Sequence, residues 1–151
     1  MKKIVFGSDH AGFKLKEKLK AFLEEHEMID VGTDSEERAD YPDFGYKAAE
    51  KVANGEADCG IIICGSGIGI SIAANRNPKI RCALCRTPED ATLARQHNDA
   101  NMLALGERLT DLHTAIDIVN AFLTTDFEGG RHAERVDKLA QKCYTSTHAD
   151  K

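Results

Sequence analysis

The stretch Cys59-Gly60-Ile61-Ile62-Ile63-Cys64-Gly65-Ser66-Gly67-Ile68-Gly69 decides how the chain folds. Three consecutive isoleucines do not alternate with polar residues, which is typical of a strand buried on both faces of a parallel sheet. Glycines follow at every second position, and a short apolar segment over residues 68–75 then has the length of a helix. The stretch therefore predicts a buried strand, a tight glycine turn and a helix, with Cys64 where the strand meets the turn.

Strand and helix patterns alternate over the rest of the chain. Short apolar runs predict strands at residues 3–6, 28–31, 61–64, 80–85 and 102–105. Apolar residues three and four apart predict helices between them, with starts near Pro42 and at Thr87-Pro88. The apolar positions are Leu15, Leu19, Phe22 and Leu23 in the first helix, Leu112, Ile116, Val119 and Leu123 after the fifth strand, and Val136, Leu139, Ala140 and Cys143 in the last helix.

This alternation predicts an α/β fold, a single Rossmann-like doubly wound domain with a five-stranded parallel sheet and helices on both faces. We expect the domain to span residues 1–145 and residues 146–151 to form a flexible tail.

Composition limits the possible functions. A net charge of -5 over 151 residues does not favour nucleic acid or an anionic membrane as a partner, and no apolar run approaches the ~20 residues of a membrane span. The five cysteines are odd in number and several lie in apolar runs, which favours free thiols and a cytoplasmic location. Cys82 and Cys85 form a C-x-x-C pair inside a predicted strand, so we interpret them as core thiols, with redox chemistry as the alternative.

The glycine loop is a candidate binding site, because ligands of doubly wound sheets bind at the carboxyl ends of the strands. Its backbone N–H groups would point outward at a helix start and favour an anion. Its G-x-G-x-G spacing differs from the dinucleotide fingerprint, and the next strand ends in Cys85-Arg86 without an acidic residue, which argues against a dinucleotide. The alternative is that the glycines only allow close packing of strand and helix.

Cys64 is the candidate reactive group of this loop. Oriented amides at a helix start favour the thiolate form, which can act as a nucleophile or a general base. The alternative is a small buried apolar residue, the commonest role of a free cysteine.

Two histidines are further candidates. Asp9 and His10 follow the first strand at the same edge of the sheet, where Asp9 is also a favoured helix N-cap. His97 lies between the fourth helix and the fifth strand, and simple solvent exposure is its alternative. No pair of histidines has the spacing of metal ligands, so we predict no metal site.

Arg131 and Arg135 are four residues apart and share a face of the last helix, with His132 between them. Cations at a helix start are disfavoured by ~0.3–1 kcal/mol each. A bound phosphate would reverse this cost, since guanidinium groups bind phosphate with two parallel hydrogen bonds. The alternative is a solvated basic turn, partly offset by Glu134. A thiol, an amide loop, histidines and a phosphate clamp together suit proton abstraction next to the carbonyl of a sugar phosphate.

Five motifs occur in order along the chain: GSDHAG at 7–12, DYPD at 40–43, ICGSGIGISIAANR at 63–76, ARQHNDANMLALGERL at 94–109 and EGGRHAERV at 128–136. Together they resemble the ribose-5-phosphate isomerase B family, which also includes galactose-6-phosphate and allose-6-phosphate isomerases. The resemblance covers nearly the whole chain.

The resemblance implies that the chain interconverts ribose 5-phosphate and ribulose 5-phosphate through an enediol, with Cys64 carrying the proton between C2 and C1. It implies that Ser66 steadies the base or a substrate oxygen and that His97 opens the sugar ring. The loop amides would hold the enediolate. The residues that it implies for sugar and phosphate binding are Asp9, His10, Tyr41, Gly65, Gly67, Ile68, Gly69, Asn98, Arg108, Arg131 and Arg135.

The resemblance also implies a homodimer, sometimes paired into a tetramer, with active sites between two chains and no cofactor. Some family members carry a glutamate a few residues beyond the cysteine; this chain has Ser71 there and looks like the cysteine branch. A six-carbon sugar 6-phosphate (allose or galactose) is an alternative substrate. A non-catalytic phosphosugar- or nucleotide-binding domain is another, although mere binding needs no thiol base. Because Cys64 ends the third strand and His97 precedes the fifth, we expect them at opposite edges of one sheet, so that a partner chain completes the site.

Overall fold

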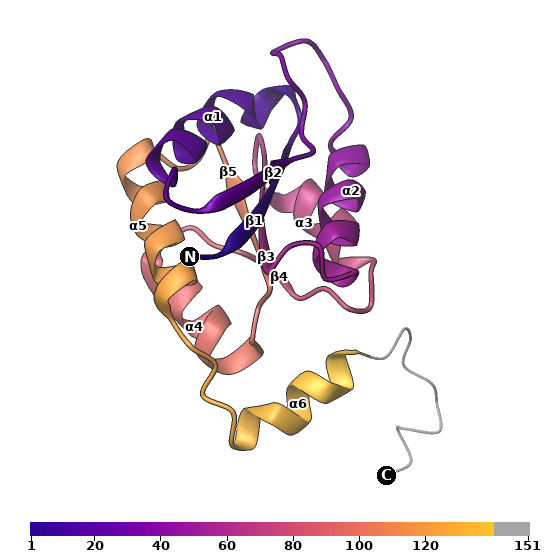
Figure 1. Ribbon diagram of the computed structural model, residues 1–151, viewed down its shortest axis with the longest axis vertical. Helices are drawn as coiled ribbons and strands as arrows, with labels where there is room; N and C mark the ends of the chain where they lie inside the picture. Colours follow the sequence, from indigo (N-terminus) through magenta and orange to yellow (C-terminus); the bar gives the residue numbers. More distant parts are fainter. Residues whose placement is uncertain (141–151) are drawn as a thin grey trace.

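The computed structural model describes residues 1–140, so the predicted tail and Cys143 of the last predicted helix lie outside the described residues. The strands are β1 (Lys3–Ser8), β2 (Glu27–Asp30), β3 (Cys59–Cys64), β4 (Cys82–Leu84) and β5 (Met102–Gly106). The helices are α1 (Phe13–Phe22), α2 (Tyr41–Ala53), α3 (Ile68–Asn75), α4 (Pro88–Asn98), α5 (Leu112–Thr124) and α6 (Arg131–Leu139), and a short 3-10 helix, η1 (His10–Gly12), precedes α1 (Figure 1). Within residues 1–140, no helix has the length and apolar character needed to cross a membrane.

All strand pairs of the sheet are parallel, in the order β2-β1-β3-β5-β4. β2 lies on one side of β1 and β3 on the other, so the strand order reverses between β1 and β3. At such a switch point the loops that leave the two strands diverge and open a crevice. Helices α1, α4 and α5 cover one face of the sheet and α2 and α3 the other, which confirms the predicted doubly wound α/β fold (Figure 1).

Side-chain caps fix the start of three helical segments, namely η1, α4 and α5, where Asp111 accepts from the Thr114 N–H. The Asp90 N–H donates to Thr87 Oγ1 at 3.1 Å, so α4 begins at Pro88, as the sequence predicts. Asp9 Oδ1 accepts a hydrogen bond from the Gly12 N–H at 3.1 Å and caps η1. The predicted capping role of Asp9 is therefore confirmed.

The fourth strand is shorter than predicted and covers only Cys82–Leu84. The Ile80 N–H donates to the Asn77 carbonyl in a turn, and the Arg81 N–H donates to the side chain of Asn101 at 2.8 Å. These bonds keep residues 80–81 out of the strand ladder.

Three helical positions also differ from the prediction. His97 lies in the last turn of α4 and not in the loop that follows it. Phe22 is 46% exposed because α1 ends there. In α5 the predicted Val119 is buried and Ile116 and Leu123 pack against the core, but Leu112 is exposed, and Ala115, Ile118 and Phe122 complete the buried face.

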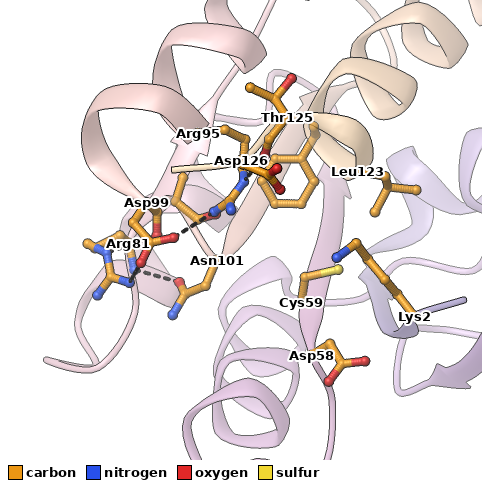
Figure 2. Close-up of a pocket in the computed structure, with 12 residues that line it drawn as sticks. Lys2, Asp58, Cys59, Arg81, Arg95, Asp99, Asn101, Leu123, Thr125 and Asp126 are labelled. Atoms are coloured by element: carbon orange, nitrogen blue, oxygen red, sulfur yellow. Dashed lines mark hydrogen bonds and ion pairs between the residues drawn. The ribbon is translucent and has the colours of Figure 1, made fainter. Parts of the chain in front are cut away.

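A polar pocket of about 290 Å³ lies at the amino edge of the sheet, opposite the crevice. Figure 2 shows Arg81 and Arg95 on two sides of Asp99, the residue that follows α4. Asp99 has a left-handed φ of 46°, and Arg95 Nη1 donates to its Oδ1 at 2.9 Å while Arg81 Nη2 donates to its carbonyl at 2.9 Å. Arg81 Nε also donates to the Asn98 carbonyl at 3.0 Å. These bonds end α4 and fix the backbone beside His97.

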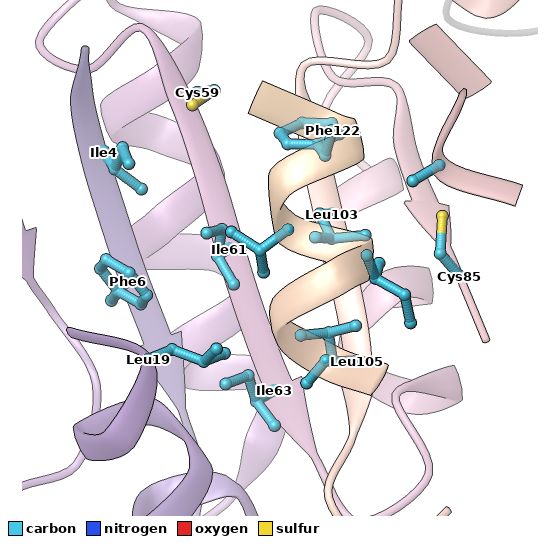
Figure 3. Packing of buried hydrophobic residues seen from close by; sticks show 14 of the residues in the cluster. Ile4, Phe6, Leu19, Cys59, Ile61, Ile63, Cys85, Leu103, Leu105 and Phe122 are labelled. Carbon is cyan, nitrogen blue, oxygen red and sulfur yellow. The ribbon is translucent and has the colours of Figure 1, made fainter. Parts of the chain in front are cut away.

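Two hydrophobic cores lie on the two faces of the sheet. Alternate strand residues pack under α1, α4 and α5, among them Ile4, Phe6, Ile61, Ile63, Leu103 and Leu105 (Figure 3). The residues between them pack under α2 and α3, namely Val5, Ile62, Cys64, Met102 and Ala104. Burial on both faces explains the isoleucine run, since each buried isoleucine contributes about 1.5–3 kcal/mol. Cys64 thus ends β3 on the α2–α3 face.

Candidate active site

A cleft of about 500 Å³ opens where β1 and β3 end. Its walls come from η1, the first residue of α2, the glycine loop and the segment after β5. The lining residues that the sequence predicts as site residues are Asp9, His10, Tyr41, Cys64, Gly65, Ser66, Ile68, Gly69 and Arg108, and Ala11 and Leu109 complete the walls. Gly67 belongs to the same loop without lining the cleft. The structure therefore gathers most of the predicted residues at the switch point of the sheet.

The Cys64 thiol lies at the base of this cleft and is 4% exposed. The Gly67 N–H donates to Cys64 Sγ at 3.2 Å, so the sulfur accepts a backbone hydrogen bond at the start of α3. The Ile68 N–H donates to Ser66 Oγ at 3.1 Å, so the Ser66 hydroxyl keeps its own proton for another acceptor. The start of α3 thus presents amide N–H groups to both side chains.

The other cysteines in residues 1–140 have different surroundings. Burial raises the pKa of Cys59 to about 11 and that of Cys85 to about 12, and it also raises the pKa of Cys82. These thiols stay protonated at neutral pH. Cys85 is 1% exposed and Cys82 is half-buried on β4, as expected for core thiols.

Two glycines of the loop allow side chains to lie directly on its backbone. A Cβ at Gly65 would come within 2.8 Å of Arg108 Nη1, and a Cβ at Gly69 within 2.6 Å of the Tyr41 ring. The Arg108 N–H also donates to the Gly65 carbonyl at 3.0 Å. The close-packing interpretation therefore holds at these two positions, and the packing brings Arg108 and Tyr41 to the cleft.

His10 is held by the loop that precedes α2. Its Nδ1 lies 3.1 Å from the donating N–H of Ala39 and 3.2 Å from the Ala39 carbonyl. Because the backbone of Ala39 holds Nδ1, Nε2 is the nitrogen available to a ligand in the cleft.

The remaining predicted residues, His97, Asn98, Arg131 and Arg135, do not line this cleft. Met102, the first residue of β5, pairs with Gly60 and Cys82, whereas Gly106 at its other end pairs with Cys64. Since His97 ends α4 shortly before Met102, it lies toward the amino edge of the sheet. The predicted separation of Cys64 and His97 within one chain is confirmed.

At the amino edge, His97 meets two residues from the start of α6. The rings of His97 and His132 stack with centroids 4.3 Å apart and planes at 17°. Glu128 Oε1 lies 3.6 Å from His132 Nε2 and 4.0 Å from His97 Nε2. Burial lowers the pKa of His132, and the neighbouring His97 ring and the guanidinium groups of Arg131 and Arg135 lower it further. Sequence reasoning missed Glu128, because spacing along the chain cannot reveal a cluster that two packed helices assemble.

Comparison with known proteins identifies the family. The family described as Ribose/Galactose Isomerase matches residues 4–139. The chain is 52% identical over 141 residues to "Ribose-5-phosphate isomerase B" of Escherichia coli (strain K12), a match covering 92% of this chain and 95% of that protein.

Two solved structures agree with this match. The ribose-5-phosphate isomerase B of Clostridium thermocellum is 54% identical with a TM-score of 0.90, over 91% of this chain and 95% of that one. The protein of this type from Thermotoga maritima is 50% identical with a TM-score of 0.90, over 92% and 97%. The fold is thus that of an α/β sugar-phosphate isomerase. The chain belongs to the ribose/galactose isomerase family, and the relatives named here are ribose-5-phosphate isomerases of type B.

Proposed function

We propose that the chain interconverts ribose 5-phosphate and ribulose 5-phosphate. The observation that carries this proposal is the Cys64 thiol at the base of the cleft, with the Gly67 N–H on its sulfur, in a chain about half identical to proteins of that name. A domain that only binds a phosphosugar or a nucleotide has no use for a thiolate at this position, so catalysis is favoured over binding alone.

The reaction needs a proton transfer between adjacent carbons. The Cys64 thiolate takes the proton from C2 of the open aldose, and the electron pair of that C–H bond forms the C1–C2 double bond of an enediolate. The loop amides bind O1, the oxygen that becomes negatively charged. They therefore stabilise the enediolate and the transition state that leads to it. The Ser66 hydroxyl donates a hydrogen bond to a substrate oxygen and keeps its proton. The hydroxyl proton on O2 passes to O1, and the Cys64 thiol returns its proton to C1 as the C2 carbonyl forms.

The other two tasks are ring opening and phosphate binding. His97 moves a proton between the anomeric hydroxyl and the ring oxygen, with Asn98 beside it. His10 and Arg108 in the cleft, with Arg131 and Arg135, bind the phosphate, since charge-assisted hydrogen bonds suit this group. Asp9 and Tyr41 bind the sugar.

His97 and the two arginines reach the cleft from a partner chain in a homodimer. Several large apolar side chains of one chain are exposed, among them Ile68 at 45%, Ile72 at 59%, Leu109 at 56% and Leu139 at 56%. Ile68 and Leu109 also line the cleft. A partner chain that covers these exposed apolar side chains would therefore lie at the mouth of the cleft. A two-fold dimer would complete two equivalent sites. Reduced thiols at Cys59, Cys64, Cys82 and Cys85 fit a cytoplasmic location.

Purified protein tests the proposal. We expect ketose to form from ribose 5-phosphate at the same rate before and after dialysis against EDTA, and more slowly from allose 6-phosphate or galactose 6-phosphate. Faster turnover of a hexose phosphate would establish the six-carbon alternative. Saturable sugar-phosphate binding without turnover of any of the three would establish the binding domain.

A further inference from the structure

Three potential metal ligands meet at the amino edge of the sheet, away from the cleft of the same chain. They are His97 in the last turn of α4, Glu128 before α6 and His132 in the first turn of α6. Their ligand atoms all lie within 4.8 Å of one another. Two imidazoles and one carboxylate are a common ligand set for zinc sites that keep a fourth position open.

The backbone holds this cluster together. The Glu128 N–H donates to the carbonyl of Gln96 at 3.1 Å, which ties Glu128 to the residue before His97. The His132 N–H donates to the Gly129 carbonyl at 3.0 Å and anchors the start of α6. These bonds keep the three segments that carry the side chains close together.

His132 gives an independent sign of a ligand. Its side chain is 8% exposed, and its Nε2 has no hydrogen-bond partner among residues 1–140. Buried polar atoms without a partner are rare in folded proteins, and an unmet one calls for an explanation such as an ion. Nε2 faces Glu128 Oε1 at 3.6 Å, a separation too long for a hydrogen bond.

The separations suit a small divalent ion after two adjustments. Because the rings of His97 and His132 stack with planes at 17°, the ring of His97 has to turn until its Nε2 faces the ion, and Glu128 has to move closer. A tetrahedral zinc ion with ligands at roughly 2.0–2.1 Å holds its ligand atoms roughly 3.4 Å apart. From the observed 3.6 and 4.0 Å, Glu128 Oε1 has to approach each nitrogen by less than about 1 Å. The side chains of Glu128 and His97 are 49% and 38% exposed and have room to move. Arg131 and Arg135 oppose a cation, so affinity should be lower than at a structural zinc site.

We propose that His97, Glu128 and His132 bind Zn²⁺ and that the bound ion inhibits the isomerase. The inhibition rests on the proposed function, in which His97 moves a proton during ring opening. A metal ion on the imidazole occupies the lone pair that would accept this proton. The ion is therefore an inhibitor at this site, and catalysis does not need it.

Direct binding tests the site without any activity assay. Chelator-treated protein is titrated with Zn²⁺ by calorimetry and with Co²⁺ by visible absorption. We expect one equivalent per chain and a cobalt spectrum without thiolate charge-transfer bands. Glu128→Gln keeps the shape of the side chain and removes its charge. It should weaken Zn²⁺ binding by more than about 10–100-fold, which is the loss typical of residues that only hydrogen-bond a metal ligand. His132→Ala should do the same.

The matched control is His113→Ala. His113 is 90% exposed and faces Asp117 at 3.4 Å, so it offers an imidazole and a carboxylate on the surface of α5. This variant should bind and turn over as the wild type does. Two results would overturn the site. One is a cobalt spectrum with thiolate bands that disappear in Cys64→Ser or Cys82→Ser, and the other is an unchanged Zn²⁺ affinity in Glu128→Gln.

Isomerase assays then test inhibition. Zn²⁺ should inhibit the wild type over the concentrations at which it binds, with recovery on adding EDTA, and should inhibit Glu128→Gln only at higher concentrations. Full activity with the site filled would refute the inhibition. Metal binding without turnover of any sugar phosphate would refute the proposed function and leave the metal site intact, whereas turnover without binding would refute the metal site alone.

Discussion

Cys64 and His97 of one chain are separated by the length of β5. Gly106, which pairs with Cys64, ends that strand, and Met102, which starts it, follows His97 by one short turn. Four residue steps of a parallel strand cover about 13 Å. If both residues act on one substrate, as proposed above, His97 has to come from another chain.

Mixing two inactive variants tests this sharing. Cys64→Ala and His97→Ala are unfolded mildly and refolded together. About half of the dimers should be mixed, and each mixed dimer has one site without a lesion, so about a quarter of wild-type activity should return. Mass spectrometry of intact dimers checks that the subunits have exchanged.

Each variant refolded alone is the control and should stay inactive. If both residues of a site came from one chain, every site would carry a lesion and mixing would restore nothing. That result would exclude the shared site.

Cys64→Ala should lower kcat by about 10²–10⁴-fold or more, because the general base is removed. Substrate should still bind, since His10, Arg108 and the loop amides remain. Stopped assays give kcat, and calorimetry with ribose 5-phosphate gives the affinity. Cys82→Ser is the matched control, and it should keep wild-type kcat because burial holds that thiol protonated. A dead Cys82→Ser beside an active Cys64→Ala would show that the wrong thiol was chosen.

Arg135→Ala should raise KM with a smaller effect on kcat. A charge-assisted hydrogen bond contributes about 1.5–3 kcal/mol, which corresponds to roughly 10–150-fold in affinity. Inorganic phosphate should compete with substrate in the wild type and compete less in the variant. Lys18→Ala, on the exposed side of α1, removes a positive charge elsewhere and should change neither value. An unchanged KM in Arg135→Ala would rule out the arginine clamp.

Gly67→Ala should reduce both stability and activity. Gly67 has a φ of 78°, and a Cβ there would come within 2.8 Å of the Leu105 backbone. The left-handed conformation alone costs an alanine roughly 1–2 kcal/mol. The displaced loop would lose the N–H bond on Cys64 Sγ, so kcat should fall as well. Gly55→Ala is the control, since its φ of 83° carries the same strain with nothing within 4 Å. Equal kcat in the two variants would disprove the role of the loop.

An ion pair between the buried Lys16 and the partly exposed Asp30 makes stability depend on pH. Lys16 is 1% exposed, and its Nζ donates to Asp30 Oδ2 at 2.6 Å and to the Thr33 carbonyl at 2.8 Å. Burial disfavours the Asp30 carboxylate, but hydrogen bonds from Lys16, Lys20 and the Gly32 N–H outweigh it and lower the pKa of Asp30. The pair therefore stabilises the fold above the ordinary aspartate pKa, and the contribution is lost as the pH falls through the lowered pKa.

Asp30→Asn should reduce the free energy of unfolding by about 3 kcal/mol at neutral pH, because it leaves the Lys16 charge buried without this partner. The difference from the wild type should shrink in acid, where the wild type loses the same charge. Urea unfolding at neutral and acid pH gives both values. Asp117→Asn, at a half-exposed aspartate, should stay within about 0.5 kcal/mol. An Asp30→Asn effect that does not change with pH would contradict the assignment.

The sequence predicted an element best where a single physical requirement, such as burial or a local helix start signal, determines its residues. The isoleucine run reports burial on both faces, and Thr87-Pro88 is a local start signal, so β3 and the start of α4 were predicted correctly. The amphipathic face of α5 was predicted only in part, because the small Ala115 lies on the buried side while Leu112 at the start of the helix extends into solvent. Residue type alone does not show where the buried face of an apolar helix begins and ends.

The residues of the candidate site also fall into a part that the sequence could predict and a part that it could not. Loops that leave neighbouring strands must meet at one edge, so Asp9, His10 and the Cys64 loop could be placed together from the strand pattern. The contact of His97 with Glu128 and His132 depends on how α6 packs on α4, and no local pattern encodes that packing.

The helix α6 has a consequence for how the protein responds to its own concentration. Among the residues that the structure describes, α6 buries His132 alone against its own chain. A helix of nine residues is marginal in water without packing. If a second chain covers it, dilution separates the subunits and also removes what holds Arg131 and Arg135 in helical register. Activity would then fall more steeply on dilution than subunit separation alone predicts. When the protein is concentrated again, activity would recover only as fast as this helix folds.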